Sequence, residues 1–176
     1  MQKRILFCFL FSIVFIFNIF PQAFEFEDYS ETSEKWGLIV NPNTMQSIEE
    51  QLIDFAKKYL GTPYKYAGKT PAGFDCSGFA GFVFKEFGIT LPASSSEIAK
   101  VGETVEKEDL KVGDLVFFEG RNHTKTVGHV GIVSEINEVD VYFIHAAVWS
   151  GGIIISGMKE EYYASRYLKA KRVKIN

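Results

Sequence analysis

The stretch Phe74-Asp75-Cys76-Ser77-Gly78-Phe79 has the pattern of a helix start. Asp75 is a residue type that caps helix N-termini, and apolar residues follow it at helical spacing. Cys76 therefore lies in the first turn, where unpaired backbone N–H groups and the positive end of the helix dipole favour a thiolate. This placement predicts a nucleophilic cysteine. The alternative is that a lone cysteine packs as a small apolar residue.

An earlier helix and a series of later strands surround this stretch. Ser47 and Glu50 have the spacing of a capping box, and helical apolar spacing continues from Ile48 until Gly61. Segments rich in Val, Ile and Phe predict strands at 114–118, 129–136, 140–147, 151–156 and 167–175. Helices followed by strands predict an α+β fold, with N-terminal helices packed on one face of an antiparallel sheet of about five or six strands.

The first 23 residues have the layout of a secretory signal peptide. Two basic residues precede an apolar run from Ile5 to Phe17, and Ala23 offers a cleavage site. Pro21 cuts this run short of the roughly 20 residues that a membrane span needs. We therefore predict export to the periplasm, or to the cell wall and extracellular space, with no stable membrane span after processing. An uncleaved anchor is the alternative.

Composition limits the partners of the rest of the chain. The chain has 176 residues, of which 47% are hydrophobic and 23% are charged, as in an average soluble domain. Its net charge of −3 offers no basic field to nucleic acid, so we expect no nucleic-acid partner. The stretch 24–46 begins with many acidic side chains and predicts a flexible lead, which leaves one domain at 47–176. We expect a monomer.

The candidate chemistry rests on one cysteine and the histidines. Once the signal segment is removed, Cys76 is the only cysteine, so it cannot form an intramolecular disulfide. The chain has three histidines, and His123, in a polar stretch, receives no role. His129 opens one predicted strand and His145 lies near the end of the next, so a turn centred on Asn137 would place their imidazoles directly opposite each other. One ring could then orient the other while that ring takes the thiol proton.

Five motifs of this chain resemble, in order, those of the NlpC-type cell-wall peptidases. The resemblance covers about residues 48–175. It implies a papain-like α+β domain that hydrolyses peptidoglycan stem peptides, usually at the bond between γ-D-glutamate and a diamino acid. The motifs are Gly61-Thr62-Pro63-Tyr64, Phe74-Asp75-Cys76-Ser77-Gly78-Phe79, Gly113-Asp114-Leu115-Val116-Phe117-Phe118, His129-Val130-Gly131-Ile132 and Ile144-His145-Ala146.

The same resemblance implies a role for each candidate catalytic residue. Cys76 matches the nucleophile, His129 matches the general base, and His145 matches the polar residue that orients the base. The implied reaction passes through a thioester and needs no metal or other cofactor. A zinc site made by the three side chains is an alternative, but the sequence offers no fourth ligand motif.

Three further positions match residues that line the substrate cleft. Tyr64 matches a tyrosine whose hydroxyl lies near the thiol, while Asp75 and Ser77 match cleft positions beside the nucleophile. Core packing of Tyr64 and helix capping by the other two are the alternatives. The segment 93–97 lacks an arginine that the family often has there, which leaves the substrate preference open. Extra length between Phe118 and His129 is expected to reshape one wall of the cleft.

Other activities remain compatible with the sequence. An amidase or acyltransferase on the same scaffold would keep the cysteine chemistry and change the bond. A catalytically idle module would bind the cell wall without cleaving it. A secreted toxin would act on the walls of competing cells.

Overall fold

The computed structural model describes residues 46–122 and 124–175. Contacts divide the chain into two units between Thr44 and Met45, and the described residues belong to the second unit. The predicted signal segment, 1–23, lies outside the described residues, as does the predicted acidic lead except for its last residue.

Two longer helices come first in the described chain. Helix α2 (Ile48–Lys57) begins after the expected capping box: the Ser47 hydroxyl accepts the Glu50 N–H at 3.1 Å, and the Glu50 carboxylate accepts the Ser47 N–H at 2.9 Å. Helix α3 (Cys76–Glu86) begins directly after Asp75. The short helices are α4 (Ser95–Ile98), η3 (Lys107–Asp109) and α5 (Glu161–Ala164).

Six strands form one antiparallel sheet in the order β3-β8-β4-β5-β6-β7. The α+β prediction and the strand count are therefore confirmed. The short strand β3 and a two-stranded hairpin before α3 were not predicted from the sequence. The strands are β1 (Lys69–Thr70), β2 (Gly73–Phe74), β3 (Glu103–Val105), β4 (Leu115–Glu119), β5 (Val127–Ile136), β6 (Val141–Ala147), β7 (Gly152–Gly157) and β8 (Tyr167–Arg172).

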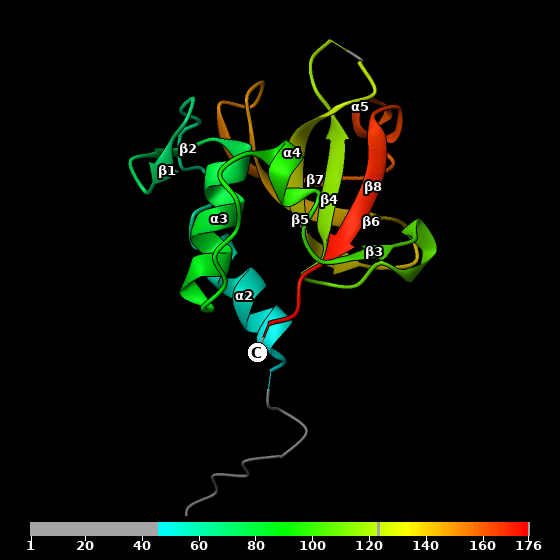
Figure 1. The fold of residues 1–176 in the computed structure, drawn as a ribbon, viewed down its shortest axis with the longest axis horizontal. Coiled ribbons are helices and arrows are strands. Elements are labelled where there is room, and N and C mark those ends of the chain that lie inside the picture. Colours follow the sequence, from blue (N-terminus) through cyan, green and yellow to red (C-terminus); the bar gives the residue numbers. More distant parts are fainter. Residues whose placement is uncertain (1–45, 123, 176) are drawn as a thin grey trace, which may run out of the picture. The chain divides into compact units, whose positions relative to one another are not determined.

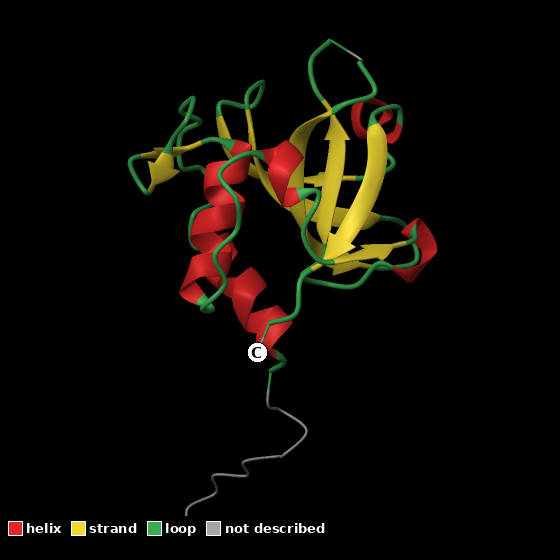
Figure 2. Ribbon diagram, in the orientation of Figure 1, coloured by secondary structure: helices red, strands yellow, loops and turns green. Residues whose placement is uncertain are grey.

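Helices α2 and α3 lie on one side of the curved sheet (Figure 1, Figure 2). Alternating side chains of the strands supply two separate cores. Phe117 and Val130 pack with the two helices, whereas Phe118 and Phe143 pack in a second cluster with Tyr163 on the other face. Burial on both faces fixes the strand register, because a slip of one residue would exchange the two sets of side chains.

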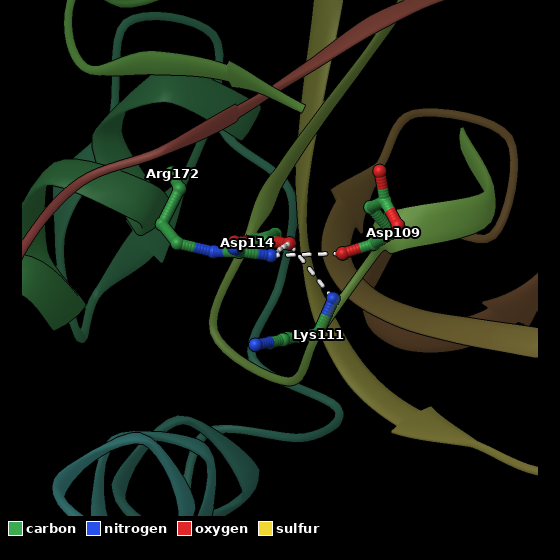
Figure 3. Close-up of polar contacts among 4 residues, drawn as sticks. All are labelled: Asp109, Lys111, Asp114 and Arg172. Carbon is green, nitrogen blue, oxygen red and sulfur yellow. Dashed lines mark hydrogen bonds and ion pairs between the residues drawn. The ribbon is translucent and has the colours of Figure 1, made fainter. Parts of the chain in front are cut away.

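A buried ion pair joins the last strand to the start of β4 (Figure 3). Asp114 is 1% exposed, and both of its carboxylate oxygens accept hydrogen bonds from Arg172 at 2.7 Å. The backbone N–H of Lys111 donates a third bond at 2.8 Å, and Arg172 also donates to the carbonyl of Asp109. These partners satisfy a carboxylate that would be costly to bury alone.

Candidate active site

Cys76 is the first residue of α3, as predicted. Asp75 caps this helix, because its carboxylate accepts the N–H of Gly78 at 2.6 Å. The thiol is partly exposed and packs against the core beside Tyr64. It also lies within hydrogen-bonding reach of the backbone N–H of Val130, the residue that follows His129. The start of α3 thus brings the cysteine to strand β5.

Burial outweighs the helix start in setting the acidity of this thiol. Desolvation raises the pKa of Cys76 to about 11, and the nearby Asp75 carboxylate acts in the same direction. Backbone N–H groups of Val130, Ser77 and Cys76 itself oppose this effect and lower the pKa. The sequence correctly predicts the favourable N–H groups, but the thiol is neutral at pH 7 in this structure.

The imidazoles of His129 and His145 contact each other, as expected. Nε2 of His129 lies 2.8 Å from Nδ1 of His145, and the rings meet edge to face at an angle of 84°. Nε2 of His145 in turn lies 3.3 Å from both the Ser156 hydroxyl and the Tyr163 hydroxyl. His145 and these two partners are buried, whereas His129 is partly exposed.

The predicted register of the two histidines was wrong by two residues. Ile136 pairs with Val141, so the turn occupies 137–140 and is not centred on Asn137. Farther along, Ile132 pairs with Ile144, so the position opposite His145 is Gly131 rather than His129. His129 lies two residues from the position opposite His145. Because side chains alternate between the faces of a strand, both histidines still lie on one face of the sheet, and their rings meet diagonally.

A bulge at Ser134 makes this offset even. The register shifts by one residue between Val133 and Glu135. Without that extra residue, the displaced turn would place the two histidines on opposite faces of the sheet. The bulge therefore brings the rings together.

Burial favours the neutral forms of both imidazoles. Desolvation lowers the pKa of His129 to about 4. The pKa of His145 is also lowered, first by burial and then by the neighbouring His129. With a neutral thiol beside Val130, the site at pH 7 holds a proton donor and an unprotonated base.

The structure places Tyr64, Asp75 and Ser77 around the thiol. Burial raises the pKa of Tyr64, and the charges of Cys76 and Asp75 raise it further. The Ser77 hydroxyl lies 3.0 Å from the Asp75 carboxylate and 3.1 Å from the carbonyl oxygen of Ala93. The helix-cap alternative holds for Asp75, whereas Ser77 connects α3 to the segment before α4.

One pocket opens beside His129, at the connections β4–β5 and β6–β7. Its wall includes Arg121 and the exposed Trp149, whose ring centroid lies 5.2 Å from the guanidinium carbon. Neither of these residues, nor Ser156 or Tyr163, was predicted from the sequence. The segment after Phe118, which is expected to reshape one wall of the cleft, contributes Glu119, Gly120 and Arg121 to this pocket. His123 lies outside the described residues.

Within residues 46–122 and 124–175, no group of three or more His, Cys, Asp or Glu side chains is placed to hold a metal ion. No helix among the same residues is both long and apolar enough to cross a membrane.

A cysteine at a helix start, packed against an antiparallel sheet that carries two linked imidazoles, places this domain in the papain-like fold class. Comparison with known proteins narrows this class. The sequence profile of the NlpC/P60 family matches residues 61–172. The chain belongs to the NlpC/P60 family, which confirms the resemblance seen in its motifs.

Named relatives of this chain act on murein or on γ-D-glutamyl peptides. The chain is 39% identical over 127 residues to the murein DD-endopeptidase MepS/murein LD-carboxypeptidase of Escherichia coli strain K12, covering 72% of this chain and 63% of that protein. It is 35% identical over 123 residues to the γ-D-glutamyl-L-lysine dipeptidyl-peptidase of Bacillus cereus, covering 70% of this chain and 36% of that protein. The matched regions thus leave more than a third of each relative uncovered.

A solved structure has the same fold. The crystal structure of an NlpC/P60 family protein from Bacillus cereus is 34% identical in sequence and superposes with a TM-score of 0.64. The match covers 72% of this chain and 40% of the other.

Proposed function

We propose that this protein is a cysteine endopeptidase that hydrolyses peptidoglycan stem peptides. The observation that carries the proposal is the placement of the Cys76 thiol against the backbone of Val130, next to the linked His129–His145 pair. Similarity to enzymes named for murein and for γ-D-glutamyl peptides supports the substrate class.

The first half of the reaction forms a thioester. His129 takes the thiol proton as the sulfur of Cys76 attacks the carbonyl carbon of the scissile amide. The backbone N–H of Cys76 is our candidate donor to the resulting oxyanion. The C–N bond then breaks, and His129 returns the proton to the leaving amine.

The second half releases the acyl product. Water attacks the thioester carbon, and His129 takes a proton from that water. The C–S bond breaks, and the proton returns to the sulfur of Cys76. The net change is hydrolysis of one amide bond.

The contacts of His145 support a single tautomer for this reaction. Nε2 of His129 faces His145, which leaves Nδ1 to accept the thiol proton. The hydrogen of the neutral His129 ring is then on Nε2 and donates to Nδ1 of His145. His145 must carry its own hydrogen on Nε2, where the hydroxyl oxygens of Ser156 and Tyr163 can accept it. His145 is therefore the orienting residue.

We propose the bond between γ-D-glutamate and the diamino acid as the scissile bond, which agrees with the specificity named for the Bacillus cereus relative. The crosslink bond cleaved by a DD-endopeptidase is a second candidate, because the Escherichia coli relative carries that name. Tyr64, Asp75 and Ser77 surround the thiol and are the proposed contacts on the acyl side of the cleft.

We further propose that the protein acts outside the cytoplasm, after export directed by residues 1–23. The basic and apolar pattern of that segment supports export. A substrate in the cell wall lies outside the cytoplasm, so the protein must be exported to reach it.

Digestion of purified muropeptides by the full chain, followed by mass spectrometry, tests the proposed function. We expect fragments that end at D-glutamate, and no fragments with Cys76→Ala or His129→Ala. Fragments separated at the crosslink would instead support the DD-endopeptidase, and release of a different product would support an amidase or acyltransferase. Binding to sacculi without any product from the unaltered chain would contradict an enzyme and support an idle wall-binding module.

A further inference from the structure

The pocket beside His129 has features that the catalytic reaction does not use. His129 forms part of its wall, and Glu119, Arg121, Trp149 and Tyr162 contribute further side chains. Trp149 is 73% exposed, although it is a large aromatic residue. An exposed aromatic ring beside a charged group is a common feature of ligand-binding surfaces.

Arg121 lines this pocket and lies against Trp149. Its guanidinium lies over the indole ring of Trp149, in the geometry of a cation–π contact. Its positive charge also lowers the pKa of Tyr64, against the stronger effects of burial, Cys76 and Asp75.

The mechanism assigns this pocket to the leaving group. His129 must donate a proton to the departing amine, so the residue that carries this amine binds against His129. The pocket that His129 lines is thus the place for the side chain of that residue. In the proposed reaction, which this inference rests on, the leaving residue is the diamino acid of the stem peptide.

The pocket wall contains charges of both signs. The guanidinium of Arg121 can bind a carboxylate through two parallel hydrogen bonds, and Glu119 adds a negative charge to the wall. The far end of diaminopimelic acid carries an ammonium and a carboxylate on one carbon. The far end of lysine carries the ammonium alone, which Arg121 would repel.

We propose that the Arg121–Trp149 pair is a specificity site for the zwitterionic end of diaminopimelic acid in the leaving residue. The guanidinium binds the distal carboxylate, the indole ring holds the guanidinium in place, and the pocket favours diaminopimelic acid over lysine.

Two tripeptides that differ by one carboxyl group test this site. L-Ala-γ-D-Glu-diaminopimelic acid and L-Ala-γ-D-Glu-L-Lys are compared as substrates of the full chain by kcat/KM. Arg121→Gln should lower kcat/KM for the first peptide by about tenfold or more, and should leave that for the second unchanged or raise it, because the repulsion of the lysine ammonium is removed. Lys125→Gln removes a positive charge from the same connection and should change neither value. An unaltered ratio in Arg121→Gln would overturn the proposal.

Binding separates failure of this site from failure of the proposed function. Calorimetry with Cys76→Ala should show tighter binding of the diaminopimelic acid peptide, and adding Arg121→Gln should abolish that preference. Preferential binding without cleavage by the unaltered chain would contradict the endopeptidase and leave the pocket assignment standing. Cleavage of both peptides with no dependence on Arg121 would contradict the pocket assignment alone.

Discussion

At the scale of single residues, two hydroxyl groups control the orientation of His145. Ser156 and Tyr163 each place an oxygen 3.3 Å from its Nε2. Removing one of them leaves a buried N–H with a single partner, and His145 can then carry its hydrogen on Nδ1, where it no longer accepts from Nε2 of His129. Both residues are therefore positioning residues, because they act through His145.

We predict that Tyr163→Phe and Ser156→Ala each lower kcat by about three- to tenfold while KM changes little. Steady-state kinetics on a stem tripeptide measures both constants. Tyr167→Phe is the matched control, because Tyr167 packs in the same cluster, its hydroxyl has no bond to His145 and the aromatic ring is kept. An equal loss in Tyr167→Phe, or a change in KM alone, would contradict the positioning role.

The protonation states of Cys76 and His129 give a second prediction. Burial raises the thiol pKa to about 11 and lowers the pKa of His129 to about 4, so both groups are neutral at pH 7. Because the neutral imidazole is the active base, kcat/KM should hold as pH falls below the ordinary imidazole pKa of about 6.5 and decline only toward pH 4.

Ultraviolet absorbance of the thiolate measures the ionisation of Cys76 directly. The difference between the unaltered chain and Cys76→Ser should be absent at pH 7 and should grow only well above the ordinary cysteine pKa of about 8.5. A thiolate signal already present at neutral pH would show a preformed ion pair, in conflict with this account.

At the scale of elements, two glycines of α3 have different roles. A Cβ atom on Gly78 would lie 2.0 Å from the carbonyl oxygen of Gly68, whereas one on Gly81 would meet no atom within 4 Å. Gly78 thus allows the loop before β1 to pack closely on the start of α3. This close contact helps to place Cys76.

We predict opposite effects of alanine at these two positions. Gly78→Ala should lower the free energy of unfolding by about 2 kcal/mol or more, because backbone atoms must move apart. Gly81→Ala should raise it by up to about 1 kcal/mol, because alanine favours the helix. Urea denaturation measures both values, and equal effects would contradict the packing role of Gly78.

Local patterns were sufficient to predict most elements of this fold. The capping box at Ser47, the helix start at Cys76 and five of the six sheet strands depend on signals within a few residues, and the structure has them. The short strand β3 was missed because its three residues pair with β8, which is distant in the sequence.

The candidate site was only partly predictable for a similar reason. The pairing of His129 with His145 could be anticipated, but the bulge at Ser134 and the turn at 137–140 have no clear local signal. Ser156, Tyr163 and Arg121 reach the site through tertiary contacts alone. The raised pKa of Cys76 depends on burial, which the sequence of the helix start does not contain.

At the scale of the whole molecule, the buried histidines couple stability to pH. The pKa values of His129 and His145 are lowered in the folded state, whereas in the unfolded chain they return to about 6.5. As pH falls below that value, the unfolded chain binds protons that the folded chain excludes, so the free energy of unfolding decreases. The contribution of His129 and His145 to the free energy of unfolding is therefore fully present above about pH 6.5 and is lost as the pH falls toward 4.

We therefore predict that the urea midpoint of the full chain falls between pH 7 and pH 5. His145→Gln should lower the midpoint at pH 7, because it disturbs the buried contacts, and should also reduce its dependence on pH. The same dependence in His145→Gln as in the unaltered chain would mean that other groups cause it.

In the proposed reaction, Cys76 forms a thioester with the acyl part of a stem peptide. This thioester can be detected in the intact mass of the full chain, quenched in acid during turnover of L-Ala-γ-D-Glu-diaminopimelic acid. We expect a species heavier by one L-Ala-γ-D-Glu acyl group, located on Cys76 and absent from Cys76→Ala. Continued product formation by Cys76→Ala, or an acyl group on another residue, would contradict it.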